Sequence, residues 1–431
     1  MRSTRRRFLG TGLTAAGSVV ALRHVPSFAT SPNGRLQVGF VGVAGRGAAN
    51  LGAISSEPTV DVVALCDVDA RNLEKAAQAH QGAKTFRDFR KMLETLGDKL
   101  DAVVVSTPDH THAPAAAMAM RMGKHCYCEK PLAHEVAEAR ALTEIAAEKG
   151  VVTQIGTQIH AGDNYRRVVE LVKAGTIGKI EEVHVWCGAS YGGLTTPTDT
   201  PPVPEYLDWD LWLGPAPYRP YHPAYVPFKW RCWYDFGSGA LGDFFCHYCD
   251  LAFWALDLKY PTRVQADGPE PLPDSTPKQL TVYYDFPARG ELPAVKLTWY
   301  DGGRRPPIQK EANLPNFGAG VLFVGESGML LADYGNHVLW PQEKFADFQP
   351  PEPTIPSSVG HHREWVQGCL EGKPTTCPFS YSGPLSEAAL LGLAAYRAQE
   401  TLEWDGPNMR VVNTTAADRY IRKEYREGWT L

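Results

Sequence analysis

The sequence predicts an α/β protein of two domains, the first built on a parallel sheet. At 431 residues, the chain is longer than one ordinary hydrophobic core organises. Its first part alternates apolar runs of β-formers with helix-like segments, a pattern typical of a parallel sheet with helices on both faces. The composition then changes at about residue 159. We therefore predict one domain at 35–158 and a second at 159–431.

The expected elements follow in order along the chain. Strands of the first domain are predicted in RLQVGFVGV, TVDVVALCD, DAVVVSTP, KHCYCEKP and VVTQIGTQ, with helices at 114–123 and 134–149. In the second domain, KIEEVHVWCG reads as a strand, and TRVQADG, KQLTVYYDFP, AVKLTWYDG and GVLFVGESGMLLADYG alternate with period two. That period is typical of strands in an open sheet with one solvated face.

Residues 1–29 are predicted to be a signal peptide outside the fold. The segment contains TRRRFL, an uncharged apolar run and a small-x-small cleavage site at 27–29. Paired arginines before Phe-Leu resemble a twin-arginine signal, which exports folded proteins. We expect a periplasmic or otherwise extracytoplasmic protein. A retained membrane anchor is the alternative, although the apolar run is short for a bilayer.

Composition narrows the classes of function. Hydrophobic residues make up 44% of the chain and charged residues 21%, as in soluble globular proteins. Removing the five arginines of residues 1–29 leaves 38 basic and 48 acidic residues, a net charge of −10, which argues against nucleic acid and anionic membranes as partners. The nine cysteines lie in apolar runs without zinc-site spacing, so we expect buried thiols and no metal site.

A glycine turn follows the first strand, in GVAGRGAANL. Gly42, Ala44 and Gly47 fall on the G-x-G-x-x-G spacing, with Ala44 in the place of the second glycine; Gly45 beside it adds backbone freedom and Arg46 lies within the turn. This spacing provides a tight turn and brings backbone N–H groups at a helix start close to a pyrophosphate. Alone, the motif is weak, because glycine turns without ligands are common.

An acid at the end of the second strand strengthens the prediction of a dinucleotide site. Asp67 lies 20 residues past Gly47, where a carboxylate accepts hydrogen bonds from the adenosine ribose. Such an acid repels a 2′-phosphate, so we predict NAD in preference to NADP, a preference that Arg46 and Arg71 would weaken. The structural alternative for Asp67 is a strand-end or helix-capping acid.

The motifs GVAGRG, CDVD, STPDHTHA, CEKPL and GALGDFFCHYCD occur in the order found in the glucose-fructose oxidoreductase / inositol dehydrogenase / MocA family. The resemblance runs from about residue 36 to the C-terminus, and EKP with D-x-x-x-H is its most selective part. It implies a Rossmann domain followed by a C-terminal α/β domain with a large open, mainly antiparallel sheet. That sheet often forms the oligomer interface, so we expect a homo-oligomer.

The resemblance also implies roles for individual residues. Lys130 matches the EKP lysine that contacts the nicotinamide ribose and the reacting hydroxyl, and Asp243 and His247 match the D-x-x-x-H pair, with His247 as the proton-transfer residue. Family members differ in whether Lys, His or Tyr delivers the proton, so the choice between Lys130 and His247 stays open. The matched residues expected beside the cofactor are Thr107, Pro108, His112 and Glu129.

The helix-like run ALGDFFCHYCDLAFWAL supports a catalytic interpretation on its own chemistry. Asp243, His247 and Asp250 share one face of this otherwise apolar helix. Oxidising a secondary alcohol requires a proton acceptor and a cation that stabilises the alkoxide, roles that suit His247 and Lys130. Asp243 is placed to orient the imidazole or the substrate, and Asp250 is expected to be structural. The alternative is a core histidine with a structural acid.

A segment rich in proline and aromatic residues occupies 190–236. Its rings and arginines suit the apolar faces and hydroxyl edges of a sugar. A packed lid or an oligomer contact uses the same residues, and both interpretations stay open. The stronger substrate candidates are Trp230, Arg231 and Trp233; the weaker ones are His160, Tyr165 and Arg166.

These observations predict an NAD(P)-dependent oxidoreductase acting on a secondary hydroxyl of a sugar, glycoside or cyclitol. Export suggests an alternative, because free NAD is not supplied outside the cytoplasm. A tightly bound cofactor would then serve a redox-neutral cycle, either NAD-dependent glycoside hydrolysis or hydride exchange between two sugars. A second alternative is a sugar-binding protein that keeps the fold without catalysis.

Overall fold

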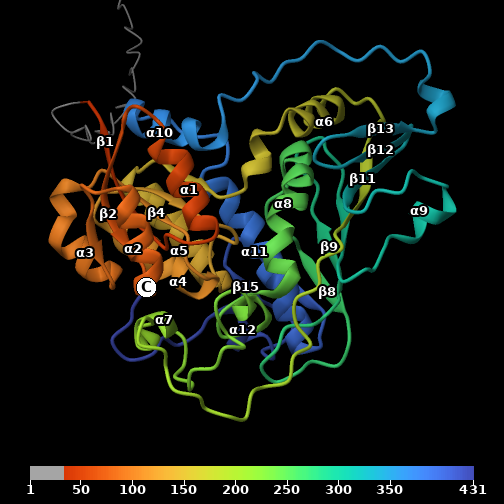
Figure 1. Cartoon of the computed structure of the whole chain (residues 1–431). Helices are drawn as coiled ribbons and strands as arrows, with labels where there is room; N and C mark the ends of the chain where they lie inside the picture. The colour runs from red at the N-terminus through yellow and green to blue at the C-terminus, as the bar shows by residue number, and fades with distance from the viewer. Residues whose placement is uncertain (1–33) are drawn as a thin grey trace, which may run out of the picture.

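The computed structural model describes residues 34–431 (Figure 1). The predicted signal peptide falls in residues 1–33, outside the described part. The chain forms two sheets separated by a layer of helices. Among the described residues, none of the helices is long and apolar enough to cross a membrane.

The first sheet is parallel throughout, as the alternation of elements predicts. Its strands lie in the order β3-β2-β1-β4-β5-β6, the doubly wound arrangement of a Rossmann domain. They are β1 (Leu36–Val41), β2 (Val60–Cys66), β3 (Lys84–Phe86), β4 (Ala102–Val105), β5 (His125–Cys128) and β6 (Thr153–Ile155). The strand order reverses between β1 and β4, where ligands bind in such sheets.

Five helices accompany these strands. They are α1 (Arg46–Ser55), α2 (Ala70–Ala79), α3 (Phe89–Leu96), α4 (Asp109–Arg121) and α5 (Val136–Lys149). The apolar runs of β1, β4 and β5 are buried almost completely, which explains why they read as continuous hydrophobic stretches. The edge strand β3 has three residues, too few to produce a recognisable pattern.

The second sheet has nine strands in the order β13-β12-β11-β7-β10-β9-β8-β14-β15. Only β7 and β10 pair in parallel, so the sheet is mainly antiparallel, as expected. The strands are β7 (Ile180–Trp186), β8 (Arg263–Asp267), β9 (Thr281–Phe286), β10 (Val295–Tyr300), β11 (Gly320–Gly325), β12 (Gly328–Ala332), β13 (His337–Trp340), β14 (Leu402–Asp405) and β15 (Arg410–Val411).

Helices α6 (Asp163–Lys173), α8 (Gly239–Leu256) and α11 (Phe379–Ala398) form the layer between the two sheets (Figure 1). Phe245 of α8 packs against Tyr284 and Trp299 of the nine-stranded sheet. Helix α8 is apolar nearly all round because it has the sheet on one side and α6 and α11 on others. Of its acidic side chains, Asp243 reaches Lys130 of the first domain, whereas Asp250 accepts a hydrogen bond from Tyr381 of α11.

Two later segments return to the first domain. Helix α10 (His361–Glu371) lies beside α1 in Figure 1, and its Trp365 and Val366 join the hydrophobic cluster around β1 and β4. The C-terminal segment places Trp429 under the guanidinium of Arg90 on α3, with 4.1 Å from Cζ to the ring centroid. The Rossmann half therefore gains part of its core from the C-terminal part of the chain.

Candidate active site

The glycine turn after β1 has the geometry that a dinucleotide pyrophosphate requires. Gly42 has φ +82°, and a Cβ at this position would lie 2.6 Å from the carbonyl oxygen of Ser106. A Cβ on Gly47 would lie 2.1 Å from the carbonyl oxygen of Gly42. Side chains are thus excluded at both positions. Helix α1 begins at Arg46 without a side-chain cap, which leaves its first N–H groups available to an anion.

Asp67 braces this turn from the end of β2. Its Oδ2 accepts a hydrogen bond from the backbone N–H of Val43 at 3.0 Å, and its Oδ1 accepts one from Asp69 at 2.9 Å. Burial raises the pKa of Asp67. Each carboxylate oxygen can accept a second hydrogen bond, so the residue can hold the turn and still bind ribose hydroxyls.

The aromatic segment 190–236 reaches across to this same edge. The backbone N–H of Ala70 donates to Tyr206 at 2.8 Å, and that of Asp208 donates to Val68 at 3.0 Å. The ring of Tyr206 lies 3.3 Å from Cζ of Arg71. A strand-like segment of the second half thus pairs with the backbone just after Asp67.

His112 connects the two loops at the carboxyl ends of β4 and β5. Its Nε2 lies 2.8 Å from the carbonyl oxygen of Thr107, and its Nδ1 lies 2.8 Å from that of Pro131. Burial lowers its pKa to about 4. The imidazole is enclosed between the two loops, next to Thr107 and Pro108 on one side and the residue after Lys130 on the other, so it fixes their separation.

Glu129 is buried under the turn. Its Oε1 accepts hydrogen bonds from Asn50 at 2.9 Å and Gln158 at 3.0 Å. Burial raises its pKa, and the charge of Lys130 opposes that effect. A Cβ at Gly156 would lie 2.4 Å from the carboxyl carbon of Glu129, so a side chain there would displace this carboxylate. Glu129 therefore anchors the loop that carries Lys130.

Lys130 meets α8 at Asp243, a residue 113 positions away in the chain. The Lys130 ammonium donates to the Asp243 carboxylate at 2.5 Å and to the Asp243 carbonyl oxygen at 2.8 Å. Arg231 approaches the other carboxylate oxygen at 3.3 Å. Burial raises the pKa of Asp243, but Lys130 and Arg231 outweigh it, and the net pKa is lowered. The carboxylate is therefore ionised and carries two cations.

His247 lies one turn further along α8. It is half-buried, and its Nδ1 is enclosed without a hydrogen-bond partner among residues 34–431. Burial and the charge of Lys130 lower its pKa to about 3, with a smaller opposing effect from Asp243. The imidazole is therefore neutral at physiological pH and can accept a hydrogen bond or a proton.

The structure adds Asp109, which sequence analysis did not single out. This first residue of α4 is completely enclosed, and its Oδ2 accepts a hydrogen bond from the Ser238 hydroxyl at 3.1 Å. Burial and the nearby Asp243 raise its pKa to about 7. The signal in the sequence was STPDH, which places a carboxyl group in the loop after a buried strand.

Several candidate substrate residues lie behind the site. Tyr165 donates its hydroxyl to the carbonyl oxygen of His247 at 3.3 Å, and Arg166 donates to that of Pro356 at 2.8 Å. His160 contacts Asp250, with 2.9 Å between Nδ1 and Oδ1, which gives Asp250 the structural partner expected of it. All three candidates are buried and support α8 and its surroundings.

The tryptophan candidates belong to the core of the aromatic segment. Trp233 is 1% exposed and donates its indole N–H to the carbonyl oxygen of Ala224 at 2.9 Å. Trp230 is also buried, and Arg231 stacks on its ring at 4.2 Å. These contacts favour the packed-lid interpretation for the tryptophans, whereas Arg231 reaches the Lys130–Asp243 pair.

All nine cysteines are buried and unpaired, as expected. Over the described residues 34–431, the side chains of His, Cys, Asp and Glu form no group of three or more that could hold a metal ion.

Comparison with known proteins matches both halves of the chain. A family model described as an oxidoreductase family with an NAD-binding Rossmann fold covers residues 36–157, and the model for the C-terminal alpha/beta domain of that family covers 172–290.

Curated relatives match over part of their length. An inositol 2-dehydrogenase of Rubrobacter xylanophilus is 32% identical over 33% of this chain and 41% of its own. A glycosyl hydrolase family 109 protein of Shewanella pealeana is 28% identical over 42% of this chain and 45% of its own. The chain thus spans less than half the length of these two relatives.

Solved structures share the fold over most of the chain. A levoglucosan dehydrogenase in complex with NADH and L-sorbose has a TM-score of 0.59 at 16% identity, covering 86% of this chain and 98% of its own. GenD2 from gentamicin A biosynthesis, in complex with NAD, has a TM-score of 0.59 at 20% identity, covering 86% and 97%. With both family models matching across more than half of its residues, the chain belongs to the Gfo/Idh/MocA family of oxidoreductases.

Proposed function

We propose that this protein is an NAD-dependent oxidoreductase that acts on a secondary hydroxyl of a sugar, glycoside or cyclitol. The observation that carries the proposal is the contact between Lys130 and Asp243, made across the two domains at the carboxyl edge of the parallel sheet. In sheets of this order, that edge is where a dinucleotide and its substrate bind. The names of the relatives, an inositol dehydrogenase among them, support a polyhydroxylated substrate.

The charges suit removal of a proton from a hydroxyl group. An ammonium group has three N–H donors, and Asp243 occupies two of those of Lys130. The third is available to a substrate oxygen, where it stabilises the negative charge that develops as the proton leaves. His247, whose imidazole is neutral, is the proposed acceptor of the proton. NAD, when bound, takes up the hydride.

We propose NAD as the cofactor in preference to NADP. Asp67 presents a carboxylate where the adenosine ribose is expected. Arg71, the basic side chain that follows it, is paired with Asp69 at 2.7 Å and covered by the ring of Tyr206. Both contacts leave the guanidinium of Arg71 less able to bind a 2′-phosphate.

A redox-neutral glycoside hydrolase is the second candidate. Two observations favour it: the glycosyl hydrolase family 109 relatives, and the pairing of segment 206–208 with the backbone after Asp67, which would slow cofactor release. In this cycle, oxidation of a hydroxyl acidifies the neighbouring C–H, the leaving group is eliminated, water adds and the carbonyl is reduced again. Hydride exchange between two sugars would also need the protein to retain its cofactor between turnovers.

Two measurements separate the candidates. The first denatures the purified protein and assays the supernatant for NAD(H); a stoichiometric amount favours a redox-neutral cycle, whereas none favours exchangeable cofactor. The second compares aryl glycosides with free sugars and cyclitols plus NAD. Reduction of added NAD supports the dehydrogenase, and release of the aryl alcohol without net NADH supports the hydrolase. If the protein turns over none of these compounds, the remaining interpretation is a sugar-binding protein without catalysis, and the proposal is contradicted.

We further propose export by a twin-arginine signal to an extracytoplasmic compartment, and self-association through the outer face of the nine-stranded sheet.

A further inference from the structure

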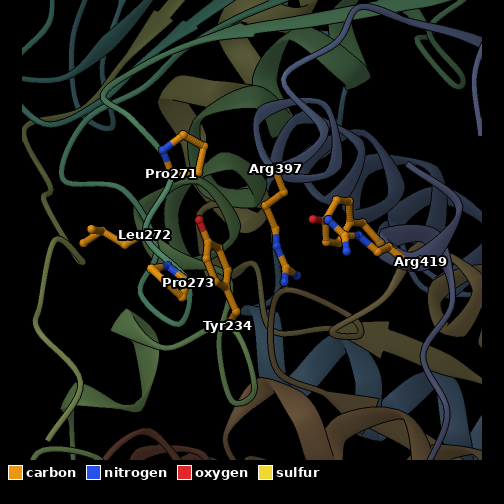
Figure 2. A pocket seen from close by; sticks show the side chains of 7 residues that line it. Tyr234, Pro271, Leu272, Pro273, Arg397 and Arg419 are labelled. Carbon is orange, nitrogen blue, oxygen red and sulfur yellow. The ribbon is translucent and has the colours of Figure 1, made fainter. Parts of the chain in front are cut away.

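A cavity of about 480 Å³ lies between the C-terminal end of α11, the short helix α12 (Asp418–Ile421) and segment 271–273 (Figure 2). Its volume falls in the range of roughly 300–1,000 Å³ that is typical of small-molecule sites. It shares no lining residue with the cleft around Lys130. The lining residues are Tyr234, Pro271, Leu272, Pro273, Arg397, Arg419 and Tyr420.

The cavity contains a stack of aromatic rings and guanidinium groups. Cζ of Arg397 lies 4.1 Å from the ring centroid of Tyr234 and 4.1 Å from that of Tyr420. Cζ of Arg419 lies 4.6 Å from the Tyr420 ring. Figure 2 shows Tyr234 and Arg397 side by side, with Arg419 beyond them. Rings on both faces hold the Arg397 guanidinium in one plane and leave its N–H edges free to donate.

The positive charge in this cavity is not balanced within the described chain. Among residues 34–431, neither Arg397 nor Arg419 has an ion pair or a hydrogen-bond acceptor. The hydroxyl of Tyr234, a residue only 5% exposed, is also buried without a partner. The cavity is therefore lined by two guanidinium groups without acceptors in the described chain, the half-buried Arg397 and the exposed Arg419. It is also lined by Tyr234, whose hydroxyl is buried without a partner, although buried donors ordinarily find one.

Glu135 is a poor counter-charge for these arginines. It lines a separate small pocket that shares Tyr234, Arg397 and Tyr420 with the cavity. Burial raises the pKa of Glu135 to about 7, although Lys423 and Arg397 act to lower it. Its carboxyl group is thus partly protonated near neutral pH and balances only part of the charge of one arginine.

We propose that this cavity is a binding site for a small oxoanion-bearing ligand, one that carries a carboxylate or phosphate on a polar body. A planar, stacked guanidinium with open N–H edges matches both groups through paired hydrogen bonds, and Arg419 and the Tyr234 hydroxyl supply further donors. The proposal is independent of the reaction at Lys130, because it adds a second site for an acidic molecule to a protein whose first site is for a neutral one.

The test is calorimetric titration of the full protein at low ionic strength with inorganic phosphate, D-glucuronate and D-glucose. We expect one of the two anions to bind and to weaken as salt is added; whether phosphate or glucuronate binds more tightly identifies the ligand group. Arg397→Gln and Arg419→Gln should each weaken that binding by about tenfold or more, the usual cost of losing a charged hydrogen bond. Arg422→Gln is the matched control, since Arg422 is exposed, close in sequence and outside the lining.

Three results would overturn the proposal: no binding of either anion to the wild-type protein, equal affinity in both lining variants, or equal loss in the Arg422→Gln control. Sedimentation of each variant adds a further check. If the lining variants change the oligomer mass while no anion binds, the arginines pair with another subunit and the proposal fails. If Arg397→Gln does not fold, Arg419→Gln alone tests the proposal. Arg419 is exposed, so its replacement should leave folding unchanged.

Discussion

The glycine turn takes its residues from positions 42–47, whereas the cleft around Lys130 collects side chains from positions 109, 130, 231, 243 and 247. In the turn, backbone geometry restricts the residues, because a Cβ at Gly47 would overlap the chain itself. In the cleft, charge restricts them: Asp243 is buried only because Lys130 and Arg231 accompany it. A local sequence motif can reveal the first kind of restriction, but the second appears only when distant segments meet.

The largest effect is expected in the cleft, from Lys130→Ala. Removing the ammonium takes away the donor proposed for the substrate oxygen, and such losses commonly reduce turnover by about 10²–10³-fold. NAD binding should persist, because the turn and Asp67 are untouched. Steady-state kinetics and NADH fluorescence titration measure the two properties, with Lys259→Ala, an exposed lysine, as the control. Full activity in Lys130→Ala would remove the proposed site.

Gly47→Ala tests the turn in the same way. The added Cβ would lie 2.1 Å from the Gly42 carbonyl oxygen, so the turn must open and the N–H groups at the start of α1 must move. We expect the increase in melting temperature produced by NAD to disappear.

Gly52→Ala is the matched control for that change, on the same helix but with no atom within 4 Å of the new Cβ. It should stabilise the protein by about 0.5–1 kcal/mol through helix propensity. Equal NAD binding by Gly47→Ala and Gly52→Ala would contradict the account of the turn.

Asp109→Asn tests whether the cleft carries an excess of acidic groups. Burial and Asp243 raise the pKa of Asp109 to about 7, so between pH 4 and 7 the folded protein keeps a proton that the unfolded chain has lost. The contribution of Asp109 to the free energy of unfolding of the wild-type protein therefore falls as the pH rises from 4 to 7. Asparagine does not titrate, so the variant should gain stability relative to wild type, by about 4 kcal/mol at pH 8 and little at pH 4.

Urea unfolding at both pH values measures the free energies of unfolding for Asp109→Asn, with Asp98→Asn, an exposed acid, as the control. A difference from wild type that does not change between pH 4 and 8 would show that Asp109 is already ionised in the folded protein.

Sequence reasoning identified Lys130, Asp243 and His247 of the cleft but missed Asp109 and the contacts that these residues make. The D-x-x-x-H spacing placed Asp243 one turn before His247 and suggested that the acid orients the imidazole or the substrate, whereas the structure places its carboxylate on Lys130. The aromatic segment shows the same limit. Sequence analysis left its tryptophans open between sugar stacking and a packed lid or oligomer contact. The sequence does not show that Trp233 donates its indole N–H to the carbonyl oxygen of Ala224 within the segment.

The smallest effect is expected where the two regions are joined, at Tyr206. Its backbone pairs with Ala70, and its ring covers Arg71 beside the expected adenosine ribose. Tyr206→Ala keeps the backbone pairing but removes the ring, which frees Arg71 and opens that edge. A cation–π contact contributes about 0.5–2 kcal/mol, so bound NADH should dissociate about fivefold faster. Loss of NADH fluorescence after dilution into excess NAD gives the rate, and Tyr218→Ala, an exposed residue of the same segment, is the control. If both variants release NADH at the wild-type rate, the segment does not help to retain the cofactor, and the case for a redox-neutral cycle loses its structural support.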